Sequence, residues 1–184
     1  MKWIKDEEFI RGNIPMTKFN IRILTLGYLA IEKGDRFLDI GAGTGSISIE
    51  AALHGAKVYA IEREEEGVEL IKTNREKFGV DIDIIKGQAP EDLPNIKINK
   101  CFIGGSGGQL EGIFSYLDIN LEDNGIVCGN FITVKNLNNF MELLNKHRYK
   151  DIEVQLIQGS VMDKIGLLKG QNPIFIVKGV KSND

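Results

Sequence analysis

The sequence is poor in metal-binding and redox-active residues and has no long apolar run. Its two cysteines, Cys101 and Cys128, lie in apolar stretches without a CxxC spacing, and its two histidines, His54 and His147, stand alone. Buried, reduced thiols are therefore expected, with neither a disulfide nor a metal site. No 18 consecutive residues are apolar, and the N-terminus MKWIKDEEFIRGN lacks the apolar core of a signal peptide. These absences favour a cytoplasmic protein without a membrane partner.

A strong excess of either charge is also absent. The chain has 23 basic and 26 acidic residues, which gives a formal net charge of -3. This near balance provides no general attraction to nucleic acid, although a local basic patch stays possible. A length of 184 residues with 42% hydrophobic content suits one domain with one buried core.

Short β-rich apolar runs alternate with helix-compatible segments in the first two thirds of the chain. Strands are expected at Arg36–Ile40, Lys57–Ile61, Asp81–Lys86 and Lys100–Ile103. Each of these runs is followed by a segment that could form a helix. The alternation predicts parallel βαβ units.

Two helices are predicted from the spacing of their apolar faces. The first stripe is Phe19, Ile23, Leu26 and Ala30, and the second is Val68, Ile71, Arg75 and Phe78. Gly79 is expected to end the second helix. Three glutamates at 64–66 open that helix, and they fit a solvated first turn favoured by the helix dipole better than an acidic catalytic cluster.

After Leu121 the pattern changes. GIVCGNFI (125–132) predicts a fifth strand, and NLNNFMELLNKH (136–147) predicts a helix. Ile152–Met162 and Pro173–Val180 then predict two further strands, which imply an antiparallel hairpin on the sheet edge. The expected fold class is α/β, with a mixed seven-stranded sheet, helices on both faces and this C-terminal hairpin.

The stretch FLDIGAGTGSISIEAA (37–52) places a glycine-rich turn between the first strand and the next helix. In open α/β sheets this carboxyl edge is where ligands bind. Glycine lets a ligand touch the backbone, and free N–H groups at a helix start favour an anionic group. A dinucleotide site would require a glycine at position 46, where Ser46 stands, so the match to a NAD site is imperfect.

The pattern D-x-G-x-G-T-G instead resembles the first motif of class I methyltransferases that depend on S-adenosylmethionine (SAM). This resemblance implies that the methionine part of SAM is held by Asp39, Gly41, Ala42, Gly43, Thr44 and Gly45. A turn that only lets helix and strand pack closely is the alternative.

Two later positions extend the expected cofactor site. Glu62 ends the second predicted strand, where an acidic side chain can accept hydrogen bonds from ribose hydroxyls. Many SAM enzymes have aspartate there. The loop after the third strand borders the adenine in such enzymes, which points to Gln88 as an amide partner and Ala89 as a backbone contact. A surface glutamate and plain turn residues are the alternatives.

The loop after the fourth predicted strand, IGGSGG, carries no carboxylate, histidine or tyrosine, and no catalytic residue can be assigned in it. Its substrate-binding candidates are Gly104, Gly105, Ser106, Gly107 and Gly108. Methyltransferases acting on exocyclic amines of bases usually have an N/D-P-P-Y type motif here. A glycine loop admits a bulky acceptor and offers N–H groups to an anion.

Three segments make the resemblance narrower: DEEFIRGNIPMTKFNIR (6–22), GQAPEDLP (87–94) and GGSGG (104–108). They are similar to the decarboxylating precorrin methyltransferases called the CbiT family. Members methylate carbon 15 of a cobalt-precorrin in corrin (cobalamin) synthesis and remove carbon dioxide from the acetate arm on carbon 12. The resemblance implies SAM as cofactor, a tetrapyrrole substrate, a Rossmann-like class I fold and a homotetramer.

The same resemblance implies one domain over 1–184, with an N-terminal segment and helix (1–34), a cofactor-binding core (35–135) and a C-terminal helix and hairpin (136–184). In the aerobic pathway a similar domain is fused to a second methyltransferase, and 184 residues are too few for that fusion. The resemblance also implies a SAM contact for Thr17, which could equally cap the first helix. Met16 and Pro15 would then form a hinge over the cofactor.

A substrate with many carboxylates needs cations. The candidates fall in the first helix or in carboxyl-edge and hairpin segments, and they are Lys18, Arg22, Lys135, Arg148, Lys164 and Lys169. For each, a solvated surface charge is the alternative. Two other functions stay open, namely a SAM methyltransferase for RNA or protein and a non-catalytic nucleotide-binding module.

Overall fold

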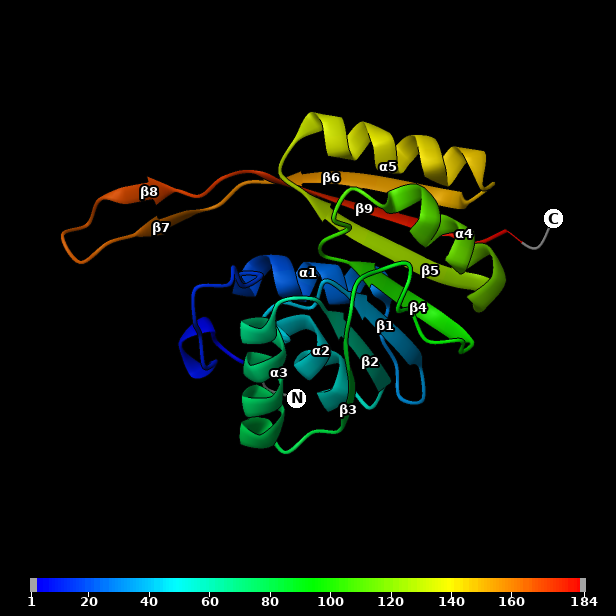
Figure 1. The fold of residues 1–184 in the computed structure, drawn as a ribbon. Coiled ribbons are helices and arrows are strands. Elements are labelled where there is room, and N and C mark those ends of the chain that lie inside the picture. Colours follow the sequence, from blue (N-terminus) through cyan, green and yellow to red (C-terminus); the bar gives the residue numbers. More distant parts are fainter. Residues whose placement is uncertain (1–2, 183–184) are drawn as a thin grey trace.

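The structure is a computed structural model that describes residues 3–182, and its centre is a seven-stranded sheet (Figure 1). The strands are β1 (Arg36–Ile40), β2 (Lys57–Glu62), β3 (Ile82–Lys86), β4 (Ile98–Ile103), β5 (Leu121–Phe131), β6 (Lys150–Ile157) and β9 (Ile174–Val180). Their order is β3-β2-β1-β4-β5-β9-β6, and β9 runs antiparallel to both of its neighbours, β5 and β6, whereas the other described strand pairs are parallel. The predicted mixed sheet is confirmed.

Helices cover both faces of the sheet. They are α1 (Phe19–Leu29), α2 (Ser46–Leu53), α3 (Glu65–Phe78), α4 (Leu110–Asn120) and α5 (Val134–Lys146), after a short 3-10 helix η1 (Asp6–Glu8). Neighbouring residues of β1 point to opposite faces, because Phe37 packs in the core beneath α1 and α2 whereas Leu38 packs beneath α4 and α5. Full burial of such a side chain contributes about 1.5–3 kcal/mol.

Two local predictions about α3 are confirmed. Gly79 is the C-cap of this helix and takes the left-handed conformation, with φ 62°. Glu64–Glu66 are exposed and form the N-cap and first turn. The prediction for α1 was partly wrong, since Phe19 and Ile23 are only half-buried and Ala30 is an exposed C-cap.

The connection between β3 and β4 contains no helix, contrary to the predicted alternation. Residues 87–97 form turns, and Gly87, Pro90 and Pro94 lie in this stretch. Proline lacks the N–H that a helix interior requires, and glycine is a poor helix former, so turns are favoured. The other predicted helices after strands are present.

The predicted C-terminal antiparallel hairpin at the sheet edge is confirmed by the pairing of β9 with the edge strand β6, but its strand boundaries differ from the prediction. The expected strand Ile152–Met162 is divided: β6 ends at Ile157, and β7 (Ser160–Met162) pairs with β8 (Leu168–Gly170) in an arm that extends away from the sheet (Figure 1). β9 is not at the edge, because it lies between β5 and β6. Its buried Ile176 and Val177 explain the continuous apolar run, since a central strand is covered on both faces.

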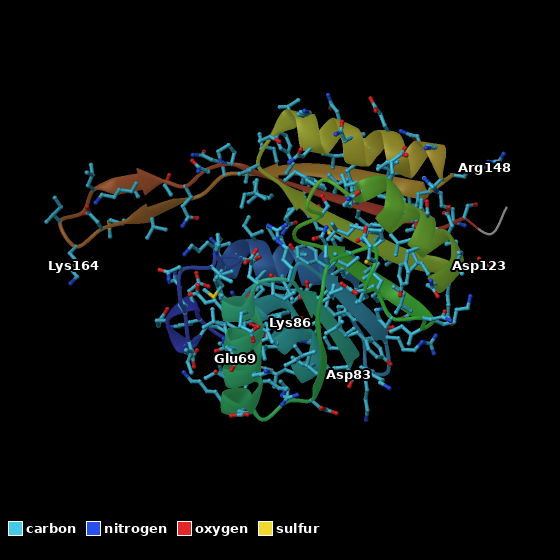
Figure 2. All side chains as sticks on the ribbon, viewed as in Figure 1. Glu69, Asp83, Lys86, Asp123, Arg148 and Lys164 are labelled. Atoms are coloured by element: carbon cyan, nitrogen blue, oxygen red, sulfur yellow. The ribbon has the colours of Figure 1, made fainter. Side chains whose placement is uncertain are left out.

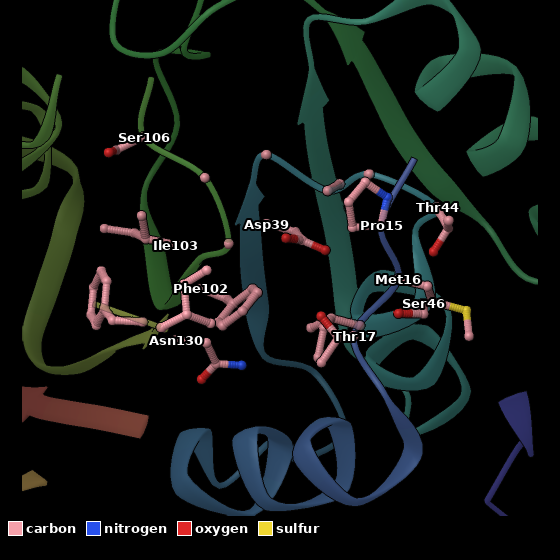
Figure 3. Close-up of a pocket in the computed structure, with 18 of the residues that line it drawn as sticks. Pro15, Met16, Thr17, Asp39, Thr44, Ser46, Phe102, Ile103, Ser106 and Asn130 are labelled. Carbon is pink, nitrogen blue, oxygen red and sulfur yellow. The ribbon is translucent and has the colours of Figure 1, made fainter. Parts of the chain in front are cut away.

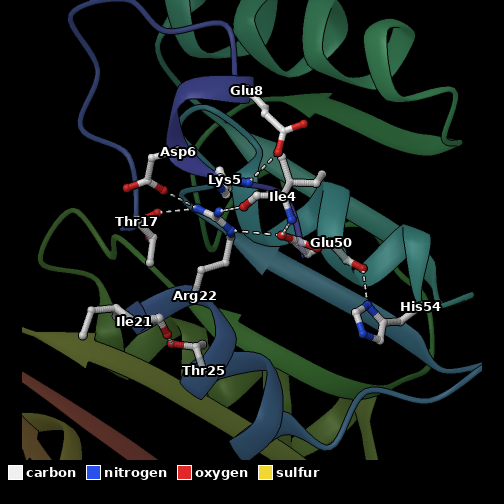
Figure 4. Close-up of polar contacts among 10 residues, drawn as sticks. All are labelled: Ile4, Lys5, Asp6, Glu8, Thr17, Ile21, Arg22, Thr25, Glu50 and His54. Carbon is white, nitrogen blue, oxygen red and sulfur yellow. Dashed lines mark hydrogen bonds and ion pairs between the residues drawn. The ribbon is translucent and has the colours of Figure 1, made fainter. Parts of the chain in front are cut away.

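Arg22 on α1 is fully buried and ties the N-terminal segment to α2 (Figure 4). Its Nη1 donates to Asp6 Oδ1 at 3.1 Å and to the Thr17 carbonyl at 2.9 Å. Its Nη2 donates to the Ile4 carbonyl at 2.5 Å, and its Nε donates to Glu50 Oε1 at 3.3 Å. One guanidinium therefore holds the segment before α1 at Ile4, Asp6 and Thr17.

This arrangement corrects two predictions. Arg22 is fully buried and its guanidinium is bound to protein groups, so it does not hold substrate carboxylates. Thr17 is not the N-cap of α1, because Lys18 takes that position while the Thr17 carbonyl is bound by Arg22.

The thiols of Cys101 and Cys128 are buried and free, as predicted. Burial raises the pKa of both thiols, which keeps them protonated. None of the helices described between residues 3 and 182 is long and apolar enough to cross a lipid bilayer.

Candidate functional site

Two cavities lie next to each other at the carboxyl edge of the sheet. The first has a volume of about 390 Å³ and is lined by Thr17, Asp39 and Asn130, among others (Figure 3). The second has a volume of about 280 Å³ and is lined by Glu62, Gln88 and Ala89, among others. Both are bordered by Pro15, Gly41, Gly43, Gly104, Gly105 and Ser106. Adjacent cavities of this kind suit an extended ligand with two different ends.

The floor between the cavities consists of backbone. Gly41 has φ 72°, and a Cβ added there would lie 2.8 Å from the Gly105 nitrogen. The N–H groups of Gly104 and Gly105 both donate to the Ile40 carbonyl, at 2.9 and 3.2 Å. The glycine turn and the GGSGG loop are therefore in direct contact, and a side chain at position 41 would separate them. At Gly105 an added Cβ would meet nothing within 4 Å.

Glu62 lies at the end of β2, where the sequence places it, and is 7% exposed. Its Oε2 accepts the Gly43 N–H at 2.8 Å and its Oε1 accepts the Glu64 N–H at 2.9 Å. Each carboxylate oxygen can accept a second hydrogen bond. Glu62 thus fixes the glycine turn. Its carboxylate oxygens can still accept hydrogen bonds from two hydroxyl groups of a ligand in the second cavity.

Asp39 and Thr44 leave buried polar atoms without partners. Ser48 Oγ donates to Asp39 Oδ2 at 2.6 Å, but within the described chain neither Asp39 Oδ1 nor Thr44 Oγ1 has a hydrogen-bond partner. Both residues line the first cavity. An unsatisfied buried polar group costs about 1–3 kcal/mol, so a polar ligand group is expected here. The ammonium and carboxylate of a methionine moiety fit this donor and acceptor set.

Burial raises the pKa of Asp39 to about 7, opposed by the Ser48 hydrogen bond and supported by the nearby Glu62 charge. If Asp39 binds the ammonium of SAM, the affinity should fall up to tenfold per pH unit below about pH 7, because a protonated carboxyl group no longer attracts that ammonium.

Calorimetric titration with SAM from about pH 6 to about pH 8 tests this dependence. Asp39→Asn should bind weakly and remove the dependence, whereas Ser48→Ala should move its midpoint to higher pH, since it removes a bond that stabilises the carboxylate. An identical pH profile in Asp39→Asn would show that another group titrates.

Sequence reasoning missed Asn130 and Asn136, which line the first cavity. The Nδ2 of Asn130 donates to Thr25 Oγ1 at 3.0 Å, and the Thr25 hydroxyl donates to the Ile21 carbonyl at 2.7 Å. Asn130 lies near the carboxyl end of β5. The rule that identified Glu62 at the end of β2 applies equally to Asn130 and could have found it.

Of the six cations considered from the sequence, two lie near the first cavity. Lys18 precedes α1 beside Thr17, and Lys135 is exposed in the first turn of α5 beside Asn136. Lys164 lies at the tip of the arm, and Lys169 on β8 pairs with Asp163 at 3.2 Å (Figure 2). Arg148 was wrongly predicted, because it follows α5 at the opposite, amino end of β5.

The described residues 3–182 contain no group of three or more His, Cys, Asp or Glu side chains that could hold a metal ion. The groups that line the two cavities are backbone N–H groups, the carboxylates of Asp39, Glu62 and Glu64, the Arg63 guanidinium and several amide or hydroxyl groups.

Comparison with known proteins gives consistent matches over almost the whole chain. A family model described as a precorrin methyltransferase domain matches residues 8–181. The probable cobalt-precorrin-6B C(15)-methyltransferase (decarboxylating) of Sulfurisphaera tokodaii is 41% identical over 187 residues, which cover 97% of each chain.

Two solved structures are similar along their full length. The precorrin-6y C5,15-methyltransferase of Geobacter metallireducens superposes with a TM-score of 0.92 at 32% identity, covering 98% of this chain and 97% of that one. The precorrin 8W decarboxylase of Methanobacterium thermoautotrophicum gives a TM-score of 0.86 at 27% identity, with 96% and 98% covered.

Proposed function

Since the chain belongs to the precorrin methyltransferase family, we propose that it transfers a methyl group from SAM to carbon 15 of a cobalt-precorrin and removes carbon dioxide from the acetate arm on carbon 12. The observation that carries this proposal is the pair of adjacent cavities on one glycine floor, with the unpartnered Asp39 Oδ1 in the first and Glu62 in the second. When bound, SAM supplies an electrophilic methyl group on a sulfonium.

We assign the two ends of the cofactor to the two cavities. Glu62 accepts the ribose hydroxyls, and Gln88 and Ala89 border the adenine in the second cavity. Asp39 and the turn residues Gly41–Thr44 bind the methionine part in the first cavity, where Thr17 closes one side, whereas Gly45 of the predicted set packs against Ile71 of α3. The segment Pro15–Thr17 lies over this site because Arg22 binds the Thr17 carbonyl.

The main task of the residues around the methyl acceptor is to position it, and activation by a protein base is less important. Gly104, Gly105 and Ser106 of the GGSGG loop line both cavities and bring no basic side chain, and Asn130 holds a fixed amide in the first cavity. Holding two reactants in line can lower the barrier by about 7–11 kcal/mol. When the carboxylate carbon leaves as carbon dioxide, its bonding electron pair passes into the conjugated ring, so the substrate is its own electron sink.

Product analysis tests the proposed reaction. Incubation with cobalt-precorrin-6B and SAM should give a product that has gained one methyl group in place of hydrogen and lost one carbon dioxide. Omission of SAM, or addition of S-adenosylhomocysteine, is the control. Binding of NAD without binding of SAM, or methylation of transfer RNA or protein by the same preparation, would overturn the proposal.

The open space beside Gly105 leads to a prediction about the loop. Gly105→Leu should lower methyl transfer and carbon dioxide release together, on the order of 100-fold, because a misplacement of about 1 Å has this effect on rate. Ser106→Ala should keep substantial activity. Both reactions are followed in parallel with labelled SAM and a labelled acetate arm. Loss of decarboxylation alone in Ser106→Ala would show that the serine has a specific role in that step.

We further propose a cytoplasmic homotetramer that acts on a tetrapyrrole and not on nucleic acid. The arm supports an oligomer, since Val161, Met162, Ile165, Leu167 and Leu168 are each more than half exposed. Two buried free thiols suit a reducing compartment. Sedimentation should show a tetramer that Ile165→Asp shifts to smaller species, and a monomeric unmodified protein would contradict the assembly.

A further inference from the structure

The precorrin ring is larger than the first cavity can enclose, so part of it must lie in a neighbouring hollow. Building on the proposed function, we infer that the part of the ring outside the first cavity is bound in a third cavity of about 370 Å³ between the start of α1 and the base of the arm. The side chains that line this cavity suit an apolar ring that carries carboxylates at its periphery.

The third cavity adjoins the reaction site at one shared side chain. Ile132, which is 69% exposed, lines both the first cavity and this one. Ile21, Ile157 and Ile174 complete the apolar lining, and Ile157 and Ile174 are cross-strand partners where β6 and β9 lead into the arm. A planar ring on this isoleucine surface would reach over Ile132 toward the methyl-transfer position. Its volume lies in the range of about 300–1,000 Å³ typical of small-molecule sites.

The polar side chains that line the third cavity are positively charged or uncharged. Lys18, Asn20, Gln171 and Asn172 border the cavity, and no acidic residue lines it in the described structure. No acidic side chain of residues 3–182 is ion-paired with Lys18. An ammonium without a protein carboxylate can pair with a carboxylate of the substrate.

The start of α1 adds backbone donors to the same rim. The first helical bond runs from the Arg22 N–H to the Lys18 carbonyl at 2.8 Å, and no side chain caps the helix. The N–H groups of Phe19, Asn20 and Ile21 thus have no partner within α1, and Asn20 and Ile21 line the cavity. Together with Lys18, these groups favour an anion at the rim.

The other opening from the reaction site has the opposite character. A cavity of about 330 Å³ between α4 and α5 shares Ser106 and Asn136 with the first cavity. Its charged lining is Glu111, Glu142 and Lys146, and the Lys146 ammonium already pairs with Glu111 at 2.7 Å. The remaining carboxylate would repel a substrate rich in carboxylates. We therefore expect the substrate to occupy the cavity between α1 and the arm rather than the cavity between α4 and α5.

Binding of uroporphyrin, a ring with a carboxylate on every peripheral arm, tests this seat in the full-length protein. Its fluorescence is titrated with protein saturated with S-adenosylhomocysteine, and coproporphyrin, which has half as many carboxylates, is compared. Lys18→Glu and Ile157→Glu should each weaken binding on the order of 10-fold or more, since each places a charge against the ring or its carboxylates. Lys33→Glu is the matched control, because Lys33 is exposed beyond the other end of α1.

The expected result is weaker binding in both cavity variants, an unchanged affinity in Lys33→Glu, tighter binding of uroporphyrin than of coproporphyrin, and normal SAM affinity in all proteins. Unchanged uroporphyrin affinity in the folded Lys18→Glu protein overturns the seat. Assays with the precorrin separate this failure from that of the function. If methyl transfer proceeds with the same KM in both variants, the seat alone is wrong, whereas absence of methyl transfer in the unmodified protein overturns the function itself.

Discussion

Glu62→Ala is expected to weaken SAM binding on the order of 100-fold or more, since two hydrogen bonds to a charged group are each worth about 1.5–3 kcal/mol. The variant also leaves the N–H groups of Gly43 and Glu64 without their acceptors. The glycine turn would then lose the contact that fixes it against β2. Isothermal titration calorimetry with SAM measures the effect directly.

Two further variants distinguish charge from shape. Glu62→Gln keeps the side-chain length, but one terminal atom becomes a donor facing a backbone N–H, so most of the affinity should still be lost. Glu69→Ala, on the exposed face of α3, changes the net charge equally and should bind SAM normally. If Glu62→Ala binds SAM as tightly as the unmodified protein, the ribose assignment is wrong.

Arg22→Met is expected to lower the free energy of unfolding by about 3–5 kcal/mol, the usual cost of removing one partner of a buried ion pair. Glu50 is 1% exposed. Without the Arg22 guanidinium, the Ile4 N–H would be the remaining hydrogen-bond donor to its carboxylate in this cluster. Urea denaturation measures the free energy of unfolding. A SAM titration shows whether the N-terminal segment keeps its position, because Pro15–Thr17 line the first cavity.

The size of this effect should depend on pH. Burial raises the pKa of Glu50, and Arg22 opposes that rise, so the variant raises it further. A carboxyl group with a raised pKa favours the folded state when protonated, and this contribution is lost as the pH rises through the folded pKa. Arg22→Met should thus be less stable at pH 8 than at pH 5, and Glu50→Gln in the same protein should restore part of the loss. A pH-independent loss would assign the effect to packing instead.

Features encoded by neighbouring residues could be predicted from the sequence. The turn at Gly41–Gly45 follows a short apolar strand, and the position of Glu62 at the end of β2 follows from the same rule. Gly79 ends α3 for a local reason, its access to positive φ. Each of these depends on contacts within a few residues of the chain.

The turns at 87–97 have a local cause in their glycine and prolines, but the other failures involve partners distant in sequence. Arg22 looks like a surface cation until Asp6 and Glu50, 16 and 28 residues away, are brought around it. The same contacts move the start of α1 past Thr17. The contact between Gly41 and Gly105 joins two glycine stretches that the sequence analysis treated separately. No pattern of neighbouring residues indicates that the two stretches touch.

The position of β9 has a consequence for how the protein is made. This strand fills the gap between β5 and β6, with its Ile126↔Val180 and Phe131↔Phe175 pairings to β5. A ribosome must therefore release residues up to Val180 before the sheet can close, and until then the apolar edge of β5 has no neighbour. Nascent chains expose such an edge to aggregation, which makes the interval before β9 emerges the vulnerable stage of translation. Pausing or truncation before Ile174 should leave a chain that binds chaperones, even though every residue of the two cavities has already been synthesised.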